Sequence, residues 1–306
     1  MPIQSLPYIL ALGFMYGGTV LASRFAVGQF SPTTYVGVRL LLAGAAFALI
    51  YLFSLQGRHW PRGKELWWKS AVLAVFGTII PMNFLVIALK FQSSGVTSML
   101  ITLNPAITVV LAHFFLPEEQ LSLRKMVGVM LALSGALLML GLGESGLPEV
   151  TQVNPLGYLL AFFAMVSSSA AMIFTRRAMK GMDAFDVSSI RMWLSALVVV
   201  PLSLGSSGFD LSKVTLTGVA ALGWASIAGT FLATLMSFYI INNFGATAAA
   251  LTAYVTPVVA TIGGALLLNE SITWGIVGGM VLIVGGISFI NREPKSLTEI
   301  GAKEVM

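Results

Sequence analysis

The stretch from Ser94 to Leu116, SGVTSMLITLNPAITVVLAHFFL, is an apolar run of membrane-spanning length that Asn104 and Pro105 interrupt near its middle. A second run of the same design extends from Gly245 to Leu268. Its proline, Pro257, follows Pro105 by 152 positions. Two interrupted helices built on one pattern are expected to face each other across a common path.

The composition is typical of a membrane protein. Hydrophobic residues make up 57% of the chain and charged residues 9%, and the mean hydropathy is +0.90. Such a chain has too little polar surface to cover a water-soluble body. It contains no cysteine, which excludes disulfides and thiolate metal sites.

Ten apolar runs have the roughly 17 to 25 residues that a helix needs to cross about 30 Å of hydrocarbon. The expected helices span residues 7–24, 33–54, 69–89, 95–115, 124–142, 155–175, 187–204, 217–241, 246–267 and 272–290. The predicted fold class is therefore an all-α integral membrane protein with ten transmembrane helices.

The basic residues indicate the topology. Twelve Lys and Arg residues lie in one set of loops and in the C-terminal tail, among them Arg58, Lys125 and Arg177, whereas the alternate loops hold three. Because basic loops favour the cytoplasm, both termini are predicted to be cytoplasmic. The net charge of +5 is then a topology signal, and no nucleic-acid partner is expected.

The spacing of 152 positions recurs along the chain. It relates Arg24 to Arg176, Arg39 to Arg191, Gly77-Thr78 to Gly229-Thr230 and Glu118 to Glu270, and with a slip of one residue it relates Gly128 and Gly135 to Gly279 and Gly286. We expect a first five-helix repeat at residues 1–143, a joint at 144–154, a second repeat at 155–291 and a cytoplasmic tail at 292–306. Because five is odd, the second repeat would be inverted in the membrane, as in many alternating-access transporters. A duplication kept only for packing is the alternative.

Motifs in both halves resemble those of a known family. They are Tyr16-Gly17-Gly18 with Ser23-Arg24, Arg39, Ala88-Leu89-Lys90, Asn104-Pro105, Glu119 with Gly128 through Gly135, and then Thr256-Pro257, Glu270, Gly279 and Gly286. In order and spacing they resemble the drug/metabolite transporter superfamily, and within it the EamA-type ten-helix carriers. By overall similarity the chain resembles most the exporters of aromatic amino acids and methionine. It departs from a symmetric pattern where Ser168 corresponds to Tyr16 and Asn242 to Lys90.

Small and hydroxylated side chains form stripes on several predicted helices, since residues at helical spacing share a face. Such stripes fit either close helix packing with interhelical hydrogen bonds or the wall of a polar cavity. On the second interpretation, the candidate substrate-binding residues are Tyr16, Thr78, Asn83, Thr97, Met99, Asn104, Thr108, Ser168, Thr234, Ser237, Thr252, Tyr254 and Thr256. We expect Tyr16 to line the central path and Ser168 to leave room there.

Two prolines and two arginines have separate expected roles. Pro105 and Pro257 each remove a helical hydrogen bond and are candidates for kinks that gate the path, although a kink without a ligand role is the alternative. Arg39 and Arg191 lie about two turns into their helices, where we expect structural anchoring or pairing rather than substrate contact.

These features predict an alternating-access exporter in a cell membrane, with a bacterial inner membrane as the expected location. Its substrate would be a small neutral or zwitterionic metabolite, with amino acids, especially aromatic ones and methionine, as the first expectation. Export of other metabolites or of amphipathic drugs is the alternative. An intramembrane enzyme is disfavoured, because no HExxH motif and no intramembrane Asp occurs. Beyond the substrate and the lipid bilayer, we expect no cofactor, metal or obligate protein partner.

Overall fold

The chain forms a bundle of helices, described by a computed structural model for residues 3–53, 57–117, 119–150, 152–207 and 210–291. Ten helical spans in these residues are long and apolar enough to cross a membrane, which confirms the number predicted from sequence. The described residues contain no strand. The predicted tail at 292–306 lies outside the described residues.

The first half contains seven α-helices and one π-helical segment, η3, which joins α3 to α4. The bounds are α1 (Leu6–Ala26), α2 (Pro32–Leu52), α3 (Lys64–Ala74), η3 (Val75–Ile79), α4 (Ile80–Ala88), α5 (Ser94–Ile101), α6 (Asn104–Phe115) and α7 (Leu123–Gly141). The third span begins at Lys64 rather than at the predicted residue 69, because the helix extends beyond the apolar run into a polar turn. In this turn and the next, Glu65 and Lys69 form an i,i+4 pair, with 2.6 Å between Oε1 and Nζ.

The second half repeats this order, with the π-helical segment η4 between α10 and α11. The bounds are α8 (Pro155–Ala178), α9 (Ala184–Ser207), α10 (Leu216–Gly223), η4 (Trp224–Leu232), α11 (Ala233–Phe244), α12 (Ala246–Ala250), α13 (Thr252–Leu268) and α14 (Trp274–Asn291). Both π-helical segments contain a Gly-Thr pair from the 152-residue spacing, Gly77-Thr78 in η3 and Gly229-Thr230 in η4. A helix that widens at both places indicates a shared local geometry.

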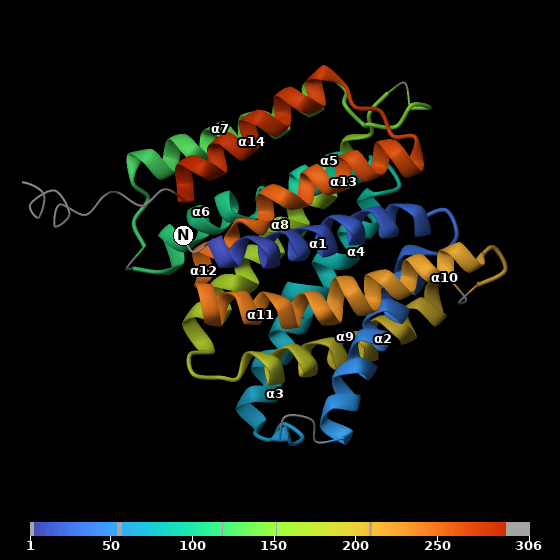
Figure 1. The fold of residues 1–306 in the computed structure, drawn as a ribbon, viewed down its shortest axis with the longest axis vertical. Helices are drawn as coiled ribbons and strands as arrows, with labels where there is room; N and C mark the ends of the chain where they lie inside the picture. Colours follow the sequence, from blue (N-terminus) through green and yellow to red (C-terminus); the bar gives the residue numbers. More distant parts are fainter. Residues whose placement is uncertain (1–2, 54–56, 118, 151, 208–209, 292–306) are drawn as a thin grey trace, which may run out of the picture.

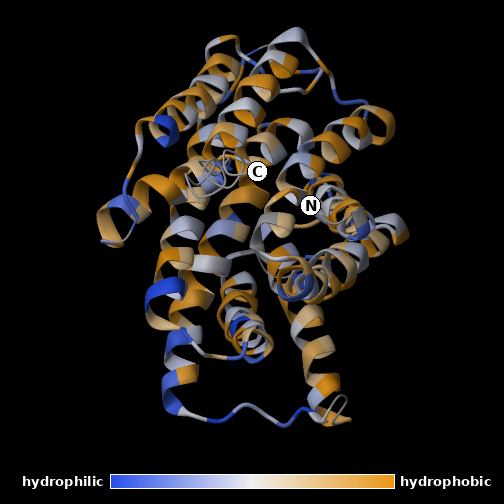
Figure 2. Ribbon diagram, turned by 60° about the vertical axis from the view of Figure 1, so that its left-hand side comes forward, coloured by the Kyte–Doolittle hydropathy of each residue, from blue (hydrophilic) through white to orange (hydrophobic). Residues whose placement is uncertain are grey.

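Hydrophobic side chains cover much of the outside of the bundle. Figure 2 shows hydrophobic residues along most of the helix lengths and hydrophilic segments mainly in the connections. Large apolar side chains such as Leu137, Leu197 and Leu266 are more than 60% exposed. In water this surface would be unfavourable, so the protein is a multi-pass membrane protein whose outer face contacts lipid.

Glycines bring α7 and α14 into close contact at one edge of the bundle (Figure 1). A Cβ atom at Gly128 would lie 2.7 Å from the carbonyl oxygen of Gly286, and one at Gly135 would lie 2.7 Å from that of Gly279. Close backbone approach of this kind is common between membrane helices. The repeat relates Gly128 to Gly279 and Gly135 to Gly286. Each glycine of α7 therefore contacts the counterpart of the other one.

Charged side chains join the two halves at the end of the bundle where α8 connects to α9. Arg58 donates from Nη1 to Oδ1 of Asp183 at 2.7 Å, and its guanidinium lies 4.5 Å from the ring centroid of Phe185. Tyr51 donates to Asp186 at 2.7 Å. Burial opposes ionisation of Asp183, yet hydrogen bonds from Arg58 and from backbone N–H groups hold the pKa of its carboxyl below the ordinary range.

Candidate functional site

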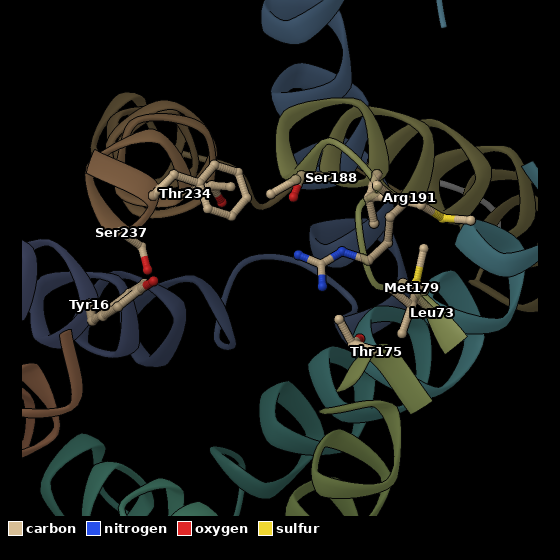
Figure 3. A pocket seen from close by; sticks show the side chains of 12 residues that line it. Tyr16, Leu73, Thr175, Met179, Ser188, Arg191, Thr234 and Ser237 are labelled. Carbon is tan, nitrogen blue, oxygen red and sulfur yellow. The ribbon is translucent and has the colours of Figure 1, made fainter. Parts of the chain in front are cut away.

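A cavity of about 250 Å³ lies between helices of both halves. It is lined by Tyr16, Leu73, Thr175, Met179, Met182, Ala184, Val187, Ser188, Arg191, Thr234, Ser237 and Phe238. These residues come from α1 and α3 of the first half and from α8, α9, α11 and the α8–α9 connection of the second. The lining mixes hydroxyl groups, apolar side chains and one cation (Figure 3).

Three of the predicted substrate-binding residues, Tyr16, Thr234 and Ser237, form a hydroxyl-bearing wall of the cavity. The hydroxyl groups of Tyr16 and Ser237 point toward each other (Figure 3). Thr234 donates through Oγ1 to the carbonyl oxygen of Thr230 at 2.6 Å, one helical turn earlier. Of the thirteen predicted binding residues, only these three line the cavity.

Arg191 extends from α9 into the cavity, and Figure 3 shows its guanidinium pointing toward the side that carries Tyr16 and Ser237. Its Nε atom is buried and has no hydrogen-bond partner among the described residues. No Asp or Glu of the described chain forms an ion pair with it either. Anchoring by pairing, which the sequence predicted for Arg191, is therefore not what its side chain does in this structure.

Arg39, the counterpart of Arg191 in the repeat, has a different environment. Its side chain is 8% exposed, and its Nε donates to Oγ1 of Thr230 at 2.8 Å. The Thr230 hydroxyl donates in turn to the carbonyl oxygen of Ala225 at 2.8 Å, five residues earlier in η4. Arg39 thus connects α2 to η4, as anchoring requires.

A second group of predicted residues forms a buried hydroxyl chain between α6 and α8. Thr108 donates to Oγ of Ser169 at 2.9 Å, and Ser169 donates to Oδ1 of Asn104 at 2.8 Å. These bonds satisfy groups that would be costly to bury alone. Ser168, predicted to leave room in the path, does not line the cavity.

The remaining predicted residues are buried or bonded within the bundle, outside the cavity. Three of them donate to backbone carbonyl oxygens three or four residues earlier in the chain: Asn83 to Ile79 at 2.8 Å, Thr252 to Ala249 at 2.7 Å and Thr256 to Thr252 at 2.9 Å. Two accept hydrogen bonds from side chains: Thr97 from Gln92 at 3.1 Å and Tyr254 from Asn291 at 3.1 Å. Met99 is 1% exposed in the apolar core, and Thr78 is 2% exposed. The Oγ1 atom of Thr78 has no partner among the described residues. Most of the predicted stripes thus make packing contacts and local hydrogen bonds.

The two prolines occupy different positions in their helices. The first run is broken between α5 and α6, so Pro105 lies in the first turn of α6, where its missing N–H leaves no helical bond unmade. Pro257 lies inside α13, and the break in that run occurs earlier, at Leu251. The expectation of two kinks built alike therefore does not match the local geometry.

Glu270 closes the packing at the end of the bundle opposite the α8–α9 connection. It is 8% exposed and accepts from the N–H of Ser94 at 2.9 Å and from the Ser94 hydroxyl at 2.6 Å. Nε of Arg24 is 3.7 Å from the same carboxylate. A carboxylate at the first turn of α5 stabilises that helix end. Glu118, its counterpart, lies outside the described residues.

Sequence reasoning missed several lining residues, including Ser188 and Thr175, and gave Arg191 a different role. Ala184, Ser188 and Arg191 recur at intervals of four and three, which places them on one face of α9. This stripe could have been found by the same criterion that identified Thr234 and Ser237. Met179 and Met182 lie at and after the C-terminal end of α8, where helical periodicity carries no information.

Comparisons with known proteins agree with this architecture. Residues 4–141 and again residues 155–292 match the model of the EamA-like transporter family. An uncharacterized transporter of Archaeoglobus fulgidus is 26% identical over 293 residues, covering 93% of this chain and 98% of the relative. The uncharacterized inner membrane transporter YedA of Escherichia coli K12 is 27% identical over 287 residues, covering 90% of this chain and 88% of the relative.

A solved structure has the same fold. The match to this crystal structure has a TM-score of 0.65 at 17% sequence identity, and it covers 92% of this chain and 94% of the solved chain. At this identity the likeness concerns the fold alone.

Proposed function

Since the chain belongs to the EamA-like transporter family, we propose that it exports small neutral or zwitterionic metabolites, with amino acids as the first substrate class, by alternating access. The observation that carries this proposal is the polar cavity of about 250 Å³ between elements of both halves. A site between two repeats is what alternating access requires.

Paired contacts support an inverted relationship between the halves. When each residue of the Gly128–Gly286 contact is replaced by its counterpart in the other half, the result is the Gly135–Gly279 contact, which the structure also contains. In the same way, a Cβ at Gly77 would face Ala171, and one at its counterpart Gly229 would face Thr19. Thr19 and Ala171 are themselves 152 positions apart. Two halves related by a twofold axis in the membrane plane would give contacts that recur in this way.

The position of the cavity supports a state open toward the cytoplasm. Its lining includes Thr175, Met179 and Ala184, which flank the α8–α9 connection. The neighbouring Arg176 and Arg177 make this connection basic, and basic connections favour the cytoplasmic side. An exporter binds its substrate from this side.

The lining supports a small amphiphilic substrate. Met179, Met182 and Phe238 offer apolar and polarisable contacts, whereas Tyr16 and Ser237 offer hydroxyl groups. The volume is below the roughly 300 to 1,000 Å³ of typical small-molecule sites. This size favours metabolites such as single amino acids over amphipathic drugs.

Transport is tested with the purified protein in liposomes. We expect efflux of a subset of labelled amino acids from preloaded liposomes, at rates well above those of protein-free liposomes. Tyr16→Ala should reduce this flux without loss of the folded protein on size-exclusion chromatography. Movement of drug-like cations without movement of any amino acid would favour the alternative substrate class, and absence of all flux would contradict the proposal.

Topology is tested separately. The native chain has no cysteine, so single cysteines at Arg62 and Lys180 can be labelled cleanly. We expect an impermeant maleimide to label them only after the cells are permeabilised. Labelling of either position in intact cells would contradict the cytoplasmic assignment.

A further inference from the structure

We propose that Arg191 binds a carboxylate group of the substrate, which deepens and rests on the proposed transport function. A cation in a membrane-embedded cavity is expensive unless something neutralises it. Arg191 is the only charged residue in the lining of the cavity that the described chain forms. The guanidinium therefore offers free donors to an anion that enters the cavity.

Three other arginines of the described chain have partners. Arg39 is bonded to Thr230, Arg24 lies beside Glu270, and Arg58 is bonded to Asp183. Arg191 alone among these four faces a cavity and pairs with no described carboxylate. A planar guanidinium matches a carboxylate with two parallel hydrogen bonds, which a hydroxyl or amide ligand cannot provide.

The arrangement of the lining predicts how the ligand lies. Tyr16, Ser237 and Thr234 are across the cavity from Arg191, and Met179 and Leu73 lie on its own side (Figure 3). A carboxylate that meets the guanidinium would lie on the side of the cavity that carries the hydroxyl groups of Tyr16 and Ser237. An ammonium group could donate to the hydroxyl groups but would find no acidic side chain in this lining.

Binding of matched carboxylates and carboxamides tests the proposal. The probes are L-phenylalanine, L-leucine and L-methionine with their carboxamides, and 3-phenylpropionate with 3-phenylpropanamide, measured by calorimetry on the detergent-purified protein. We expect at least one carboxylate to bind roughly ten- to hundredfold more tightly than its amide, the range for a hydrogen bond to a charged group. In Arg191→Gln this ratio should fall to near one, and Arg191→Lys should keep part of it.

Arg177→Gln is the matched control, because it removes a positive charge from an exposed position outside the cavity. Its carboxylate-to-amide ratio should equal that of the unchanged protein. A ratio that survives in Arg191→Gln, an equal loss in Arg177→Gln, or the absence of binding by every carboxylate would overturn the proposal. Selective binding without flux in liposomes would instead leave Arg191 as the carboxylate ligand and contradict the transport function.

A second inference comes from a different observation, the unpartnered hydroxyl of Thr78. Arg39 and Thr230, which are hydrogen bonded, correspond by the repeat spacing to Arg191 and Thr78. Nε of Arg191 and Oγ1 of Thr78 are both buried, and neither has a partner among the described residues. A Cβ at Gly77, next to Thr78, would lie 3.8 Å from Nη1 of Arg191, so the two orphan groups belong to neighbouring parts of α9 and η3.

We infer that these bonds exchange during transport. In the state described, Arg39 bonds to Thr230 and Arg191 is free; in the oppositely facing state, Arg191 bonds to Thr78 and Arg39 is free. The number of arginine–threonine bonds stays constant, so neither state gains or loses this hydrogen bond overall. A free guanidinium then always faces the side that is open to substrate.

Valine substitutions of the two threonines test the exchange, because valine keeps the shape and removes the acceptor. Single-cysteine reporters at Ser188, in the cavity, and at Val36, its counterpart 152 positions earlier, measure accessibility to an impermeant thiol reagent. Thr230→Val should raise labelling at Val36 and lower it at Ser188, with a shift of roughly tenfold or more in the equilibrium between the two states. Thr78→Val should shift both reporters the opposite way.

Thr230→Ser and Thr78→Ser retain the hydroxyl and serve as controls, with labelling expected to match that of the unchanged threonines. Shifts in the same direction for the two valine variants would overturn the exchange, as would no shift in either. Size-exclusion chromatography should show that every variant is folded. This check does not depend on the direction in which labelling shifts.

Discussion

The cavity beside Arg191 and the packed region beside Arg39 are built from corresponding positions, yet one is hollow and the other is solid. Ser188 lines the cavity, whereas its counterpart Val36 is fully buried in an apolar cluster together with Tyr35. Ser23, the counterpart of Thr175, is 3% exposed and lies 3.1 Å from the Tyr35 hydroxyl. Corresponding positions in the two halves thus have different packing, so the repeated sequence alone does not decide where the cavity lies.

Removal of the Glu270 side chain should have the largest effect on the packed region, because it removes the contacts with Ser94 and Arg24 at that end of the bundle. Glu270→Ala leaves Ser94 and Arg24 without their acceptor, and we expect a loss of roughly 3 kcal/mol in the free energy of unfolding. Glu119→Ala is the matched change at the other end, where a partly exposed carboxylate pairs with Arg176. That surface pair should contribute only about 0 to 1 kcal/mol.

Thermal unfolding of the detergent-purified variants measures this difference. A Glu270→Ala protein as stable as Glu119→Ala would show that the buried carboxylate does not hold the closed end together. The cysteine reporter at Val36 adds a second measure, since loss of the closure should increase its labelling.

The two π-helical glycines come next in expected effect. A Cβ at Gly229 would lie 2.8 Å from Cβ of Thr19, whereas one at Gly77 would lie 3.2 Å from Cβ of Ala171. Thr19 cannot rotate freely, because its hydroxyl donates to Met15 O at 2.6 Å. Gly229→Ala should therefore cost roughly 1 to 3 kcal/mol through overpacking, and Gly77→Ala less. Equal melting temperatures of the two variants would contradict this ranking.

The helix pairs α6–α8 and α1–α13 occupy corresponding places in the two halves but pack differently, and we expect a smaller effect on stability here. Ser169 joins α8 to α6 through Asn104 and Thr108, whereas its counterpart Gly17 lets α1 approach Val259 of α13 directly. Ser169→Ala removes the middle of the hydroxyl chain and should cost about 1 kcal/mol in unfolding free energy. The check is the melting temperature against that of Ser167→Ala, a neighbouring serine bonded to Phe76 O. A Ser169→Ala protein that melts with the unchanged one would show that water or a new partner replaces the hydroxyl.

The prolines should give the smallest effect, and it should be unequal. Pro257→Ala restores a donor inside α13, so we expect turnover to slow severalfold as the helix stiffens. Pro105→Ala changes the first turn of α6, where proline is tolerated, and turnover should change little. Flux in liposomes measures both, and a larger effect of Pro105→Ala would contradict the difference in helix position.

Periodicity predicted part of the cavity lining and missed the rest for a physical reason. Tyr16, Thr234 and Ser237 were found because hydroxyls at helical spacing in an apolar helix mark a face that avoids lipid. Thr108 and Asn104 satisfied the same criterion, yet their face meets α8 rather than a cavity. A polar stripe predicts burial within the bundle, but it does not distinguish a polar neighbour from water.

The sequence by itself determined the ten membrane-length helices, because the bilayer requires a minimum length of apolar helix and little else can satisfy it. It also determined which residues correspond across the two runs of the family pattern. Only the tertiary structure decided that Arg39 is bonded and Arg191 is free. The two arginines have the same local sequence position, so their difference comes from which helices approach them, and that depends on distant parts of the chain.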